Sequence, residues 1–246
     1  MKIKILLSII AAFAASVCFA APAANGAKDK SKSELKQEFK SRVETNDFGD
    51  TYIKKLPFPD EATMAKVRNL HITMLALVSY VDNELDFEKL AASVDKASGA
   101  VDKKGKRKEL VPVDGIIAGV NKYLNTKGMG LQKVGFTPNN TRNRLSDGIP
   151  LLCWVAESDL YDNDLKERAA ERKNAKSPEE WAKAVKKLEK KKIAVSRDRV
   201  FMQALVLGFN KKTNEYQLAG VSKDGPVWIT ERELKNVISS AFILRF

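Results

Sequence analysis

The chain has 246 residues and is basic, with 43 Lys and Arg against 31 Asp and Glu, which gives a formal net charge of +12 at pH 7. Its length is enough for one domain with a large buried core, and a second domain is not required. Only Cys153 lies outside the first 20 residues, so the remainder of the chain cannot form an intramolecular disulfide. Disulfide-scaffolded folds are therefore excluded.

The first 20 residues predict a secretory signal peptide. Lys2 and Lys4 precede an apolar core that ends in Ala20, which is the three-part pattern of such signals. Because the apolar run is shorter than the about 20 residues that span a bilayer, we expect cleavage and export to the periplasm or the extracellular space, without a transmembrane segment. Removal of the two lysines lowers the net charge from +12 to +10.

Residues 21–50 are rich in Ala, Lys, Ser, Glu and Asn and predict a flexible basic arm that is partly helical over 33–43. We place one domain at 51–246. Within it, apolar residues at helical spacing predict a central helix over 63–81. The residues on its buried stripe are Met64, Val67, His71, Met74, Leu75 and Val78.

Two further helices are expected before the strands begin. One starts after Asp86 as N-cap and ends before Gly99, and the other runs from Val113 to a stop at Gly128. A short strand over 131–136 precedes the connection TPNNTRNRLSDG. The nearly continuous apolar run 149–155 then predicts a strand in the centre of a sheet.

The charge-dense block 157–199 predicts a helical insertion between strands. Ser177, Pro178 and Glu180 form a helix-start signal there, and Thr230 with Glu233 forms a second one before a final helix and the closing strand AFILRF. Helices first and strands later indicate an α+β fold, with helices packed on a mainly antiparallel sheet.

Three segments together resemble papain-like cysteine peptidases, in particular the bacteriocin-processing (C39-like) branch. The segment 200–221 reads as two strands around a turn, 147–156 is similar to the strand between the two catalytic regions, and 69–95 is similar to the nucleophile helix. The resemblance spans about residue 61 to the C-terminus and implies a papain-like fold.

At the positions where the family has its nucleophile, histidine and orienting residue, this chain has side chains that cannot perform those roles. Alignment of Gly208-Phe209 with the family's Gly-Tyr pair puts Met202 at the histidine, and the orienting residue falls near Gly220. The nucleophile position falls on Asn69 or, with a shift of one residue, on Leu70, and Trp228 is expected to line the neighbourhood. The resemblance therefore implies a peptidase homologue that is catalytically inactive and binds a peptide or protein in its cleft.

An alternative is an active cysteine hydrolase that uses Cys153 and His71, the one cysteine of the mature chain and the one histidine. A nearby imidazolium can activate a thiol. However, His71 lies on the apolar stripe of the predicted central helix, and Cys153 is flanked by apolar residues. In such surroundings a cysteine is commonly a small buried hydrophobe.

The sequence contains no zinc-ligand cluster, phosphate loop or other cofactor motif. The carboxylates of 157–164 could hold a hard cation, but they lack the glycine that a calcium loop needs at its bend.

Lysines are densest in the predicted helix of the insertion, at Lys183, Lys186, Lys187, Lys190, Lys191 and Lys192. No aromatic residues alternate with these lysines for base stacking, and export argues against nucleic acid as the ligand. The second alternative is therefore a basic protein that binds anionic polymers of the cell envelope.

Overall fold

The computed structural model describes residues 31–54, 56–66, 70–100, 106, 112–156, 165–190, 200–222 and 225–246. The predicted signal peptide, Asn69, the carboxylates of 157–164, and Lys191 and Lys192 lie outside these residues.

The described part of the predicted flexible arm is folded. It contains helix α1 (Lys32–Ser41) and strands β1 (Val43–Thr45) and β2 (Asp50–Ile53). The side chain of Ser31 accepts a hydrogen bond from Glu34 N, and Glu34 in turn caps the Ser31 N–H. Phe39 and Asp50 are buried, so the prediction of a flexible arm up to residue 50 is wrong for residues 31–50. Its few apolar groups suffice because they pack on the rest of the domain.

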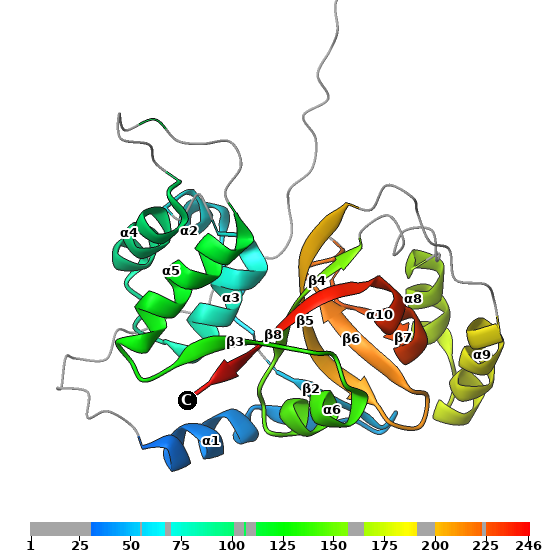
Figure 1. The fold of residues 1–246 in the computed structure, drawn as a ribbon. Helices are drawn as coiled ribbons and strands as arrows, with labels where there is room; N and C mark the ends of the chain where they lie inside the picture. The colour runs from blue at the N-terminus through cyan, green and yellow to red at the C-terminus, as the bar shows by residue number, and fades with distance from the viewer. Residues whose placement is uncertain are drawn as a thin grey trace, which may run out of the picture.

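Four helices form one side of the molecule (Figure 1). They are α2 (Glu61–Lys66), α3 (Ile72–Val81), α4 (Phe87–Ser98) and α5 (Val113–Asn125). The predicted single helix over 63–81 is therefore two helices. His71 is the N-cap of α3 with an extended backbone, so it does not lie on a helix face as expected.

The predicted ends of α4 are confirmed, whereas α5 ends at Asn125, three residues before the predicted stop at Gly128. Asp86 caps α4 by accepting a hydrogen bond from Lys89 N, and Gly99 ends this helix in the left-handed conformation at φ 59°. The two helices are in close contact at Gly119, where a Cβ would lie 2.4 Å from Cα of Val94. A side chain at that position would force the helices apart.

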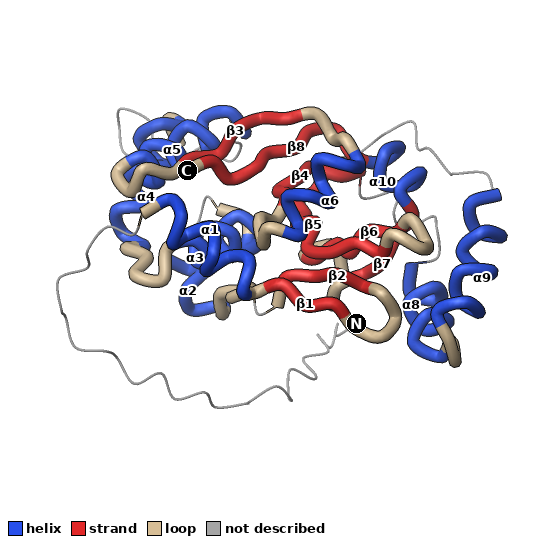
Figure 2. The backbone as a smooth tube through the Cα atoms, turned by 90° about the horizontal axis from the view of Figure 1, so that it is seen from below, coloured by secondary structure: helices blue, strands red, loops and turns tan. Residues whose placement is uncertain are grey.

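The other side of the molecule is a curled sheet in which every pair of strands is antiparallel (Figure 2). Its remaining strands are β3 (Gly130–Val134), β4 (Leu151–Ala156), β5 (Phe201–Asn210), β6 (Glu215–Ala219), β7 (Val227–Thr230) and β8 (Ile238–Arg245). The main path runs β1-β2-β5-β4-β8-β3, and β6 joins β5 to β7. Strands β4 and β2 follow one another along one edge of β5 while β6 covers the other, which curls the sheet.

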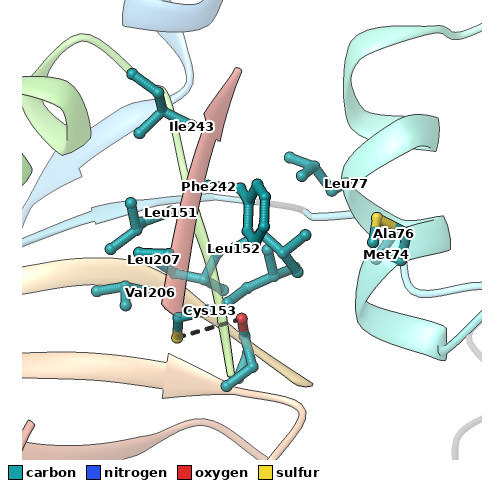
Figure 3. Close-up of a cluster of buried hydrophobic side chains, with 14 of the residues drawn as sticks. Met74, Ala76, Leu77, Leu151, Leu152, Cys153, Val206, Leu207, Phe242 and Ile243 are labelled. Atoms are coloured by element: carbon teal, nitrogen blue, oxygen red, sulfur yellow. Dashed lines mark hydrogen bonds between the residues drawn. The ribbon is translucent and has the colours of Figure 1, made fainter. Parts of the chain in front are cut away.

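Strand β4 occupies the centre of this sheet, as its apolar run predicts. All six of its residues are buried, and it pairs with β5 on one side and β8 on the other. Helix α3 contacts β4 and β5, and Figure 3 shows Leu77 of α3 directed toward Phe242 of β8. The main hydrophobic core therefore lies between α3 and the sheet.

Four helices border the sheet: α6 (Pro138–Ser146), α8 (Leu165–Asn174), α9 (Pro178–Lys190) and α10 (Glu231–Val237). The predicted starts of α9 and α10 are confirmed, and Thr230 and Glu233 form a reciprocal capping box. Helix α6 was expected to be a connection. The α+β class and the antiparallel sheet are confirmed. Within the described ranges, no helix has both the length and the apolar character needed to cross a membrane.

Candidate functional site

The start of α3 holds a small cluster of neutral polar groups. His71 Nδ1 accepts a hydrogen bond from Thr73 N at 3.3 Å and lies 2.8 Å from Thr73 Oγ1. Because Nδ1 accepts the backbone N–H, the proton of the neutral imidazole is on Nε2. Burial lowers the pKa of His71, which favours this neutral form.

Strand β5 and the end of β6 meet this helix start. Gln203 Oε1 of β5 lies 3.4 Å from Thr73 Oγ1. Gly220, directly after β6, has φ 85°, and a Cβ there would lie 2.1 Å from Cγ2 of Thr73. The threonine therefore occupies the space that a side chain at position 220 would need. We define the α3 cluster as His71, Thr73, Gln203 and Gly220.

Met202 and Trp228, which the resemblance places near the catalytic positions, are not part of the α3 cluster. Met202 precedes Gln203 in a strand whose successive side chains point to opposite faces, so Met202 points away from Thr73. An error of one residue in register is enough to exchange these faces. Trp228 stacks on the guanidinium of Arg172, with 4.0 Å between Cζ and the ring centroid, and therefore belongs to a different cluster. Gly220 does lie at the helix start, as expected.

Cys153 is fully buried in the middle of β4 and lies outside the α3 cluster. Its Sγ donates to the carbonyl oxygen of Ala204 at 3.5 Å (Figure 3). Burial raises the pKa of this thiol to about 12. A thiol in this state is protonated near neutral pH and is closed to substrate. The geometry therefore gives no support to the alternative pair of Cys153 and His71.

A second polar cluster carries charge and joins α8 to the sheet. Arg172 of α8 forms ion pairs with Asp50 at 2.5 Å and with Glu215 at 3.6 Å. Both carboxylates are buried, and Glu215 is fully inaccessible. We define the Arg172 cluster as Arg172, Asp50, Glu215, Trp181 and Trp228.

Glu215 has hydrogen-bond donors at only one of its oxygens. Trp181 Nε1 donates to Oε2 at 2.8 Å and Thr213 Oγ1 donates to Oε2 at 2.7 Å, whereas Oε1 has no hydrogen-bond partner among the described residues. Burial raises the pKa of this carboxyl despite the neighbouring Arg172. Its two carboxylates are buried, whereas Arg172 and Trp228 are partly exposed, and its contacts fasten α8 and α9 to β6 and β7.

The described part of the predicted insertion is thus integrated into the domain. Arg168 of α8 is also buried and pairs with Glu233 of α10 at 2.7 Å. On α9, Trp181 and Val185 face inward, whereas Lys183, Lys187 and the other described lysines of this helix are exposed. The charge-rich sequence predicted a helical segment here. It did not predict that Arg168 and Arg172 of α8 form ion pairs with carboxylates of the sheet and of α10.

Two cavities occur away from the α3 cluster. One, of about 790 Å³, lies among α6, α9 and α10, and two of its cations, Arg142 and Lys235, form ion pairs with Glu231. The other, of about 540 Å³, lies between α1 and the ends of α6 and β8. Within the described residues, no group of three or more His, Cys, Asp or Glu is arranged to hold a metal ion.

The sequence matches no protein-family model and no curated protein.

Proposed function

We propose that this chain is an exported, catalytically inactive homologue of the papain-like (C39-like) cysteine peptidases and that it acts by binding a peptide or protein. The observation that carries the proposal is the convergence of the α3 start with Gln203 and Gly220. In the family that the sequence resembles, a helix start and two strands meet in this way to assemble the nucleophile, base and orienting residue.

The side chains at this convergence supply none of those functions. Thr73 is fully buried, Gln203 is a neutral amide that does not titrate, and Gly220 has no side chain. His71 is partly exposed and neutral, with Nε2–H available as a donor. These groups can offer hydrogen bonds to a peptide but cannot generate a thiolate. Binding is therefore the function that the geometry supports best.

Fluorescein-labelled β-casein, a disordered protein chain, tests binding and cleavage in one sample. We expect its fluorescence anisotropy to rise on addition of the protein, with no release of labelled fragments. Because the chain has one histidine, the imidazole NMR signals of His71 report on this site alone. We expect them to shift on binding.

Fragment release that disappears in a Cys153→Ala variant would replace the proposal with the active hydrolase. Unchanged His71 signals at saturating casein would also overturn it. A matched pair of variants, Gln203→Ala and Gln217→Ala, locates the effect. Both residues lie in neighbouring strands, but only Gln203 contacts the α3 cluster, so only its loss should weaken binding by about tenfold.

The second candidate, binding to anionic envelope polymers, rests on the exposed lysines of α9. Lys183, Lys186, Lys187 and Lys190 all face solvent. Dextran sulfate is a suitable polymer probe, and its affinity should fall steeply with rising salt. Replacement of all four lysines by glutamine should abolish this binding while leaving casein-induced shifts of His71 in place.

A further inference from the structure

The cavity between α1 and the sheet has a composition that none of the other sites shares. Helix α1 passes beneath the C-terminal end of β8 (Figure 1), and residues at the end of α6 also line the cavity. Its volume of about 540 Å³ falls within the range of about 300–1,000 Å³ that is typical of ligand pockets. The α3 cluster does not line it, so what it binds is independent of the papain-like proposal.

Four cations surround this cavity. Lys36 and Lys40 come from α1, Arg144 from α6 and Arg245 from β8, and all four are exposed. In the described part of the chain, none of the four forms an ion pair with a carboxylate. Asp147 offsets part of their charge, and a net positive rim remains.

The floor of the same cavity is apolar. Ile149, Ile243 and Leu244 line it and are themselves almost completely buried. The ring of Phe246 is held against Phe39 of α1, with 5.6 Å between centroids. A ligand that satisfies both the rim and the floor needs an apolar group flanked by negative charges.

We propose that this cavity binds an acidic peptide segment through one apolar side chain on the floor and carboxylates at the rim. The four cations belong to three separate elements, so positive charge is distributed around the opening. Carboxylates spaced along a peptide match this distribution better than one compact phosphate group, which requires donors that converge on a point. The side-chain amides of Gln37 and Gln132 at the wall add hydrogen-bond partners for a peptide backbone.

A fluorescein-labelled peptide, Asp-Glu-Leu-Asp-Glu, tests the proposal by fluorescence anisotropy at low ionic strength. We expect saturable binding with one peptide per chain, and weakening as salt rises. The variant Lys40→Glu with Arg144→Glu reverses two rim charges and should weaken binding by about tenfold or more. The peptide with serine in place of leucine should also bind more weakly, since the floor then contacts a polar group.

The matched control is Lys96→Glu on α4 with Lys211→Glu directly after β5, which makes the same change in net charge at exposed residues that do not line the cavity. We expect this control to retain affinity within about twofold. Both variants carry only exposed substitutions, and equal thermal unfolding midpoints would establish that they are folded.

Three outcomes would overturn the proposal. Equal loss of affinity in the two variants would mean that binding follows net charge alone. Equal binding of Asn-Gln-Leu-Asn-Gln would remove the role of the carboxylates. Complete displacement of the peptide by millimolar inorganic phosphate at constant ionic strength would instead indicate a simple phosphate site.

Discussion

The α3 cluster and the Arg172 cluster are both buried polar sites beside the sheet, but they differ in charge. The α3 cluster consists of neutral groups, whereas the Arg172 cluster contains two carboxylates and a guanidinium. Strongly perturbed ionisable groups often mark active sites. Here Glu215, whose pKa burial raises, lies where α8 is attached to the sheet, whereas the groups of the α3 cluster are neutral.

This difference also separates two kinds of stabilisation. A buried ion pair gains little over a hydrophobic replacement, but loss of one partner leaves the other charge without compensation. Removing one partner of a neutral contact leaves no uncompensated charge. The contribution of such a contact to stability therefore depends on packing and hydrogen bonds. The two clusters should therefore respond very differently to single substitutions.

The largest effect is expected from Arg172→Ala. Asp50 and Glu215 would then be buried beside each other without their cation, and the free energy of unfolding should fall by about 3–5 kcal/mol. Urea denaturation measures this change. Lys173→Ala is the control on the same helix, because Lys173 is exposed, and it should change stability by less than about 0.5 kcal/mol. A loss below about 1 kcal/mol for Arg172→Ala would show that the ion pairs contribute little.

Gly220→Ala should produce the next largest effect, by steric conflict. Its new Cβ would meet Cγ2 of Thr73, and its φ of 85° disfavours a side chain, so we expect a loss of about 2–4 kcal/mol. Gly128→Ala is the matched control, with φ 69° and no atom within 4 Å of the new Cβ, and should lose about 1 kcal/mol.

Thr73→Ser removes the methyl group that Gly220→Ala would strike. Adding this second substitution should recover about 1 kcal/mol or more relative to simple additivity. Additive effects of the two substitutions would place Gly220 out of contact with Thr73 and separate the two parts of the α3 cluster.

A smaller effect is expected from acid titration of His71. Burial lowers its pKa below the ordinary 6.5, so the folded state resists protonation. Stability should be complete above pH 6.5 and decline as the pH falls from there to the lowered value, because the unfolded state takes up the proton first. Urea midpoints of the wild type and His71→Asn between about pH 8 and about pH 5 measure this difference.

Asparagine is an effective N-cap and does not titrate. The His71→Asn variant should therefore lack the loss of stability that protonation of His71 causes at low pH. An NMR titration of the imidazole checks the same point directly. An apparent pKa above 6.5 would indicate that a carboxylate approaches His71 and that the α3 cluster is not neutral.

The sequence predicted elements whose signals are local. The cap of α9 at Ser177, the cap of α10 at Thr230 and the unbroken apolar run of β4 each identify an element from neighbouring residues alone. Helix α6 was missed because its sequence is almost entirely polar, with Thr141 and Leu145 as its buried residues. Strands β1 and β2 are short and border a polar arm. They are therefore too short to show the alternation of apolar and polar residues that predicts a strand.

The candidate site depends on tertiary register, which local patterns do not encode. The resemblance pointed to Met202, one residue before Gln203, the side chain of this strand that contacts Thr73. Gln203 is a lone polar residue in an apolar strand, and this signal could have identified it. The roles of Arg168 and Arg172 were beyond prediction because their partners Asp50, Glu215 and Glu233 are far away in the chain, the nearest being Glu215, 43 residues after Arg172.

Alkylation of Cys153 by iodoacetamide tests the central claim that the chain has no reactive nucleophile of the cysteine-peptidase type. Peptide mass mapping reads this site separately from Cys18. With the thiol fully buried and its pKa raised to about 12, modification of the native protein should be at least about 1,000-fold slower than in denaturing urea. Rapid alkylation of the native protein near neutral pH, with loss of any casein cleavage, would contradict the account and restore Cys153 as a catalytic residue.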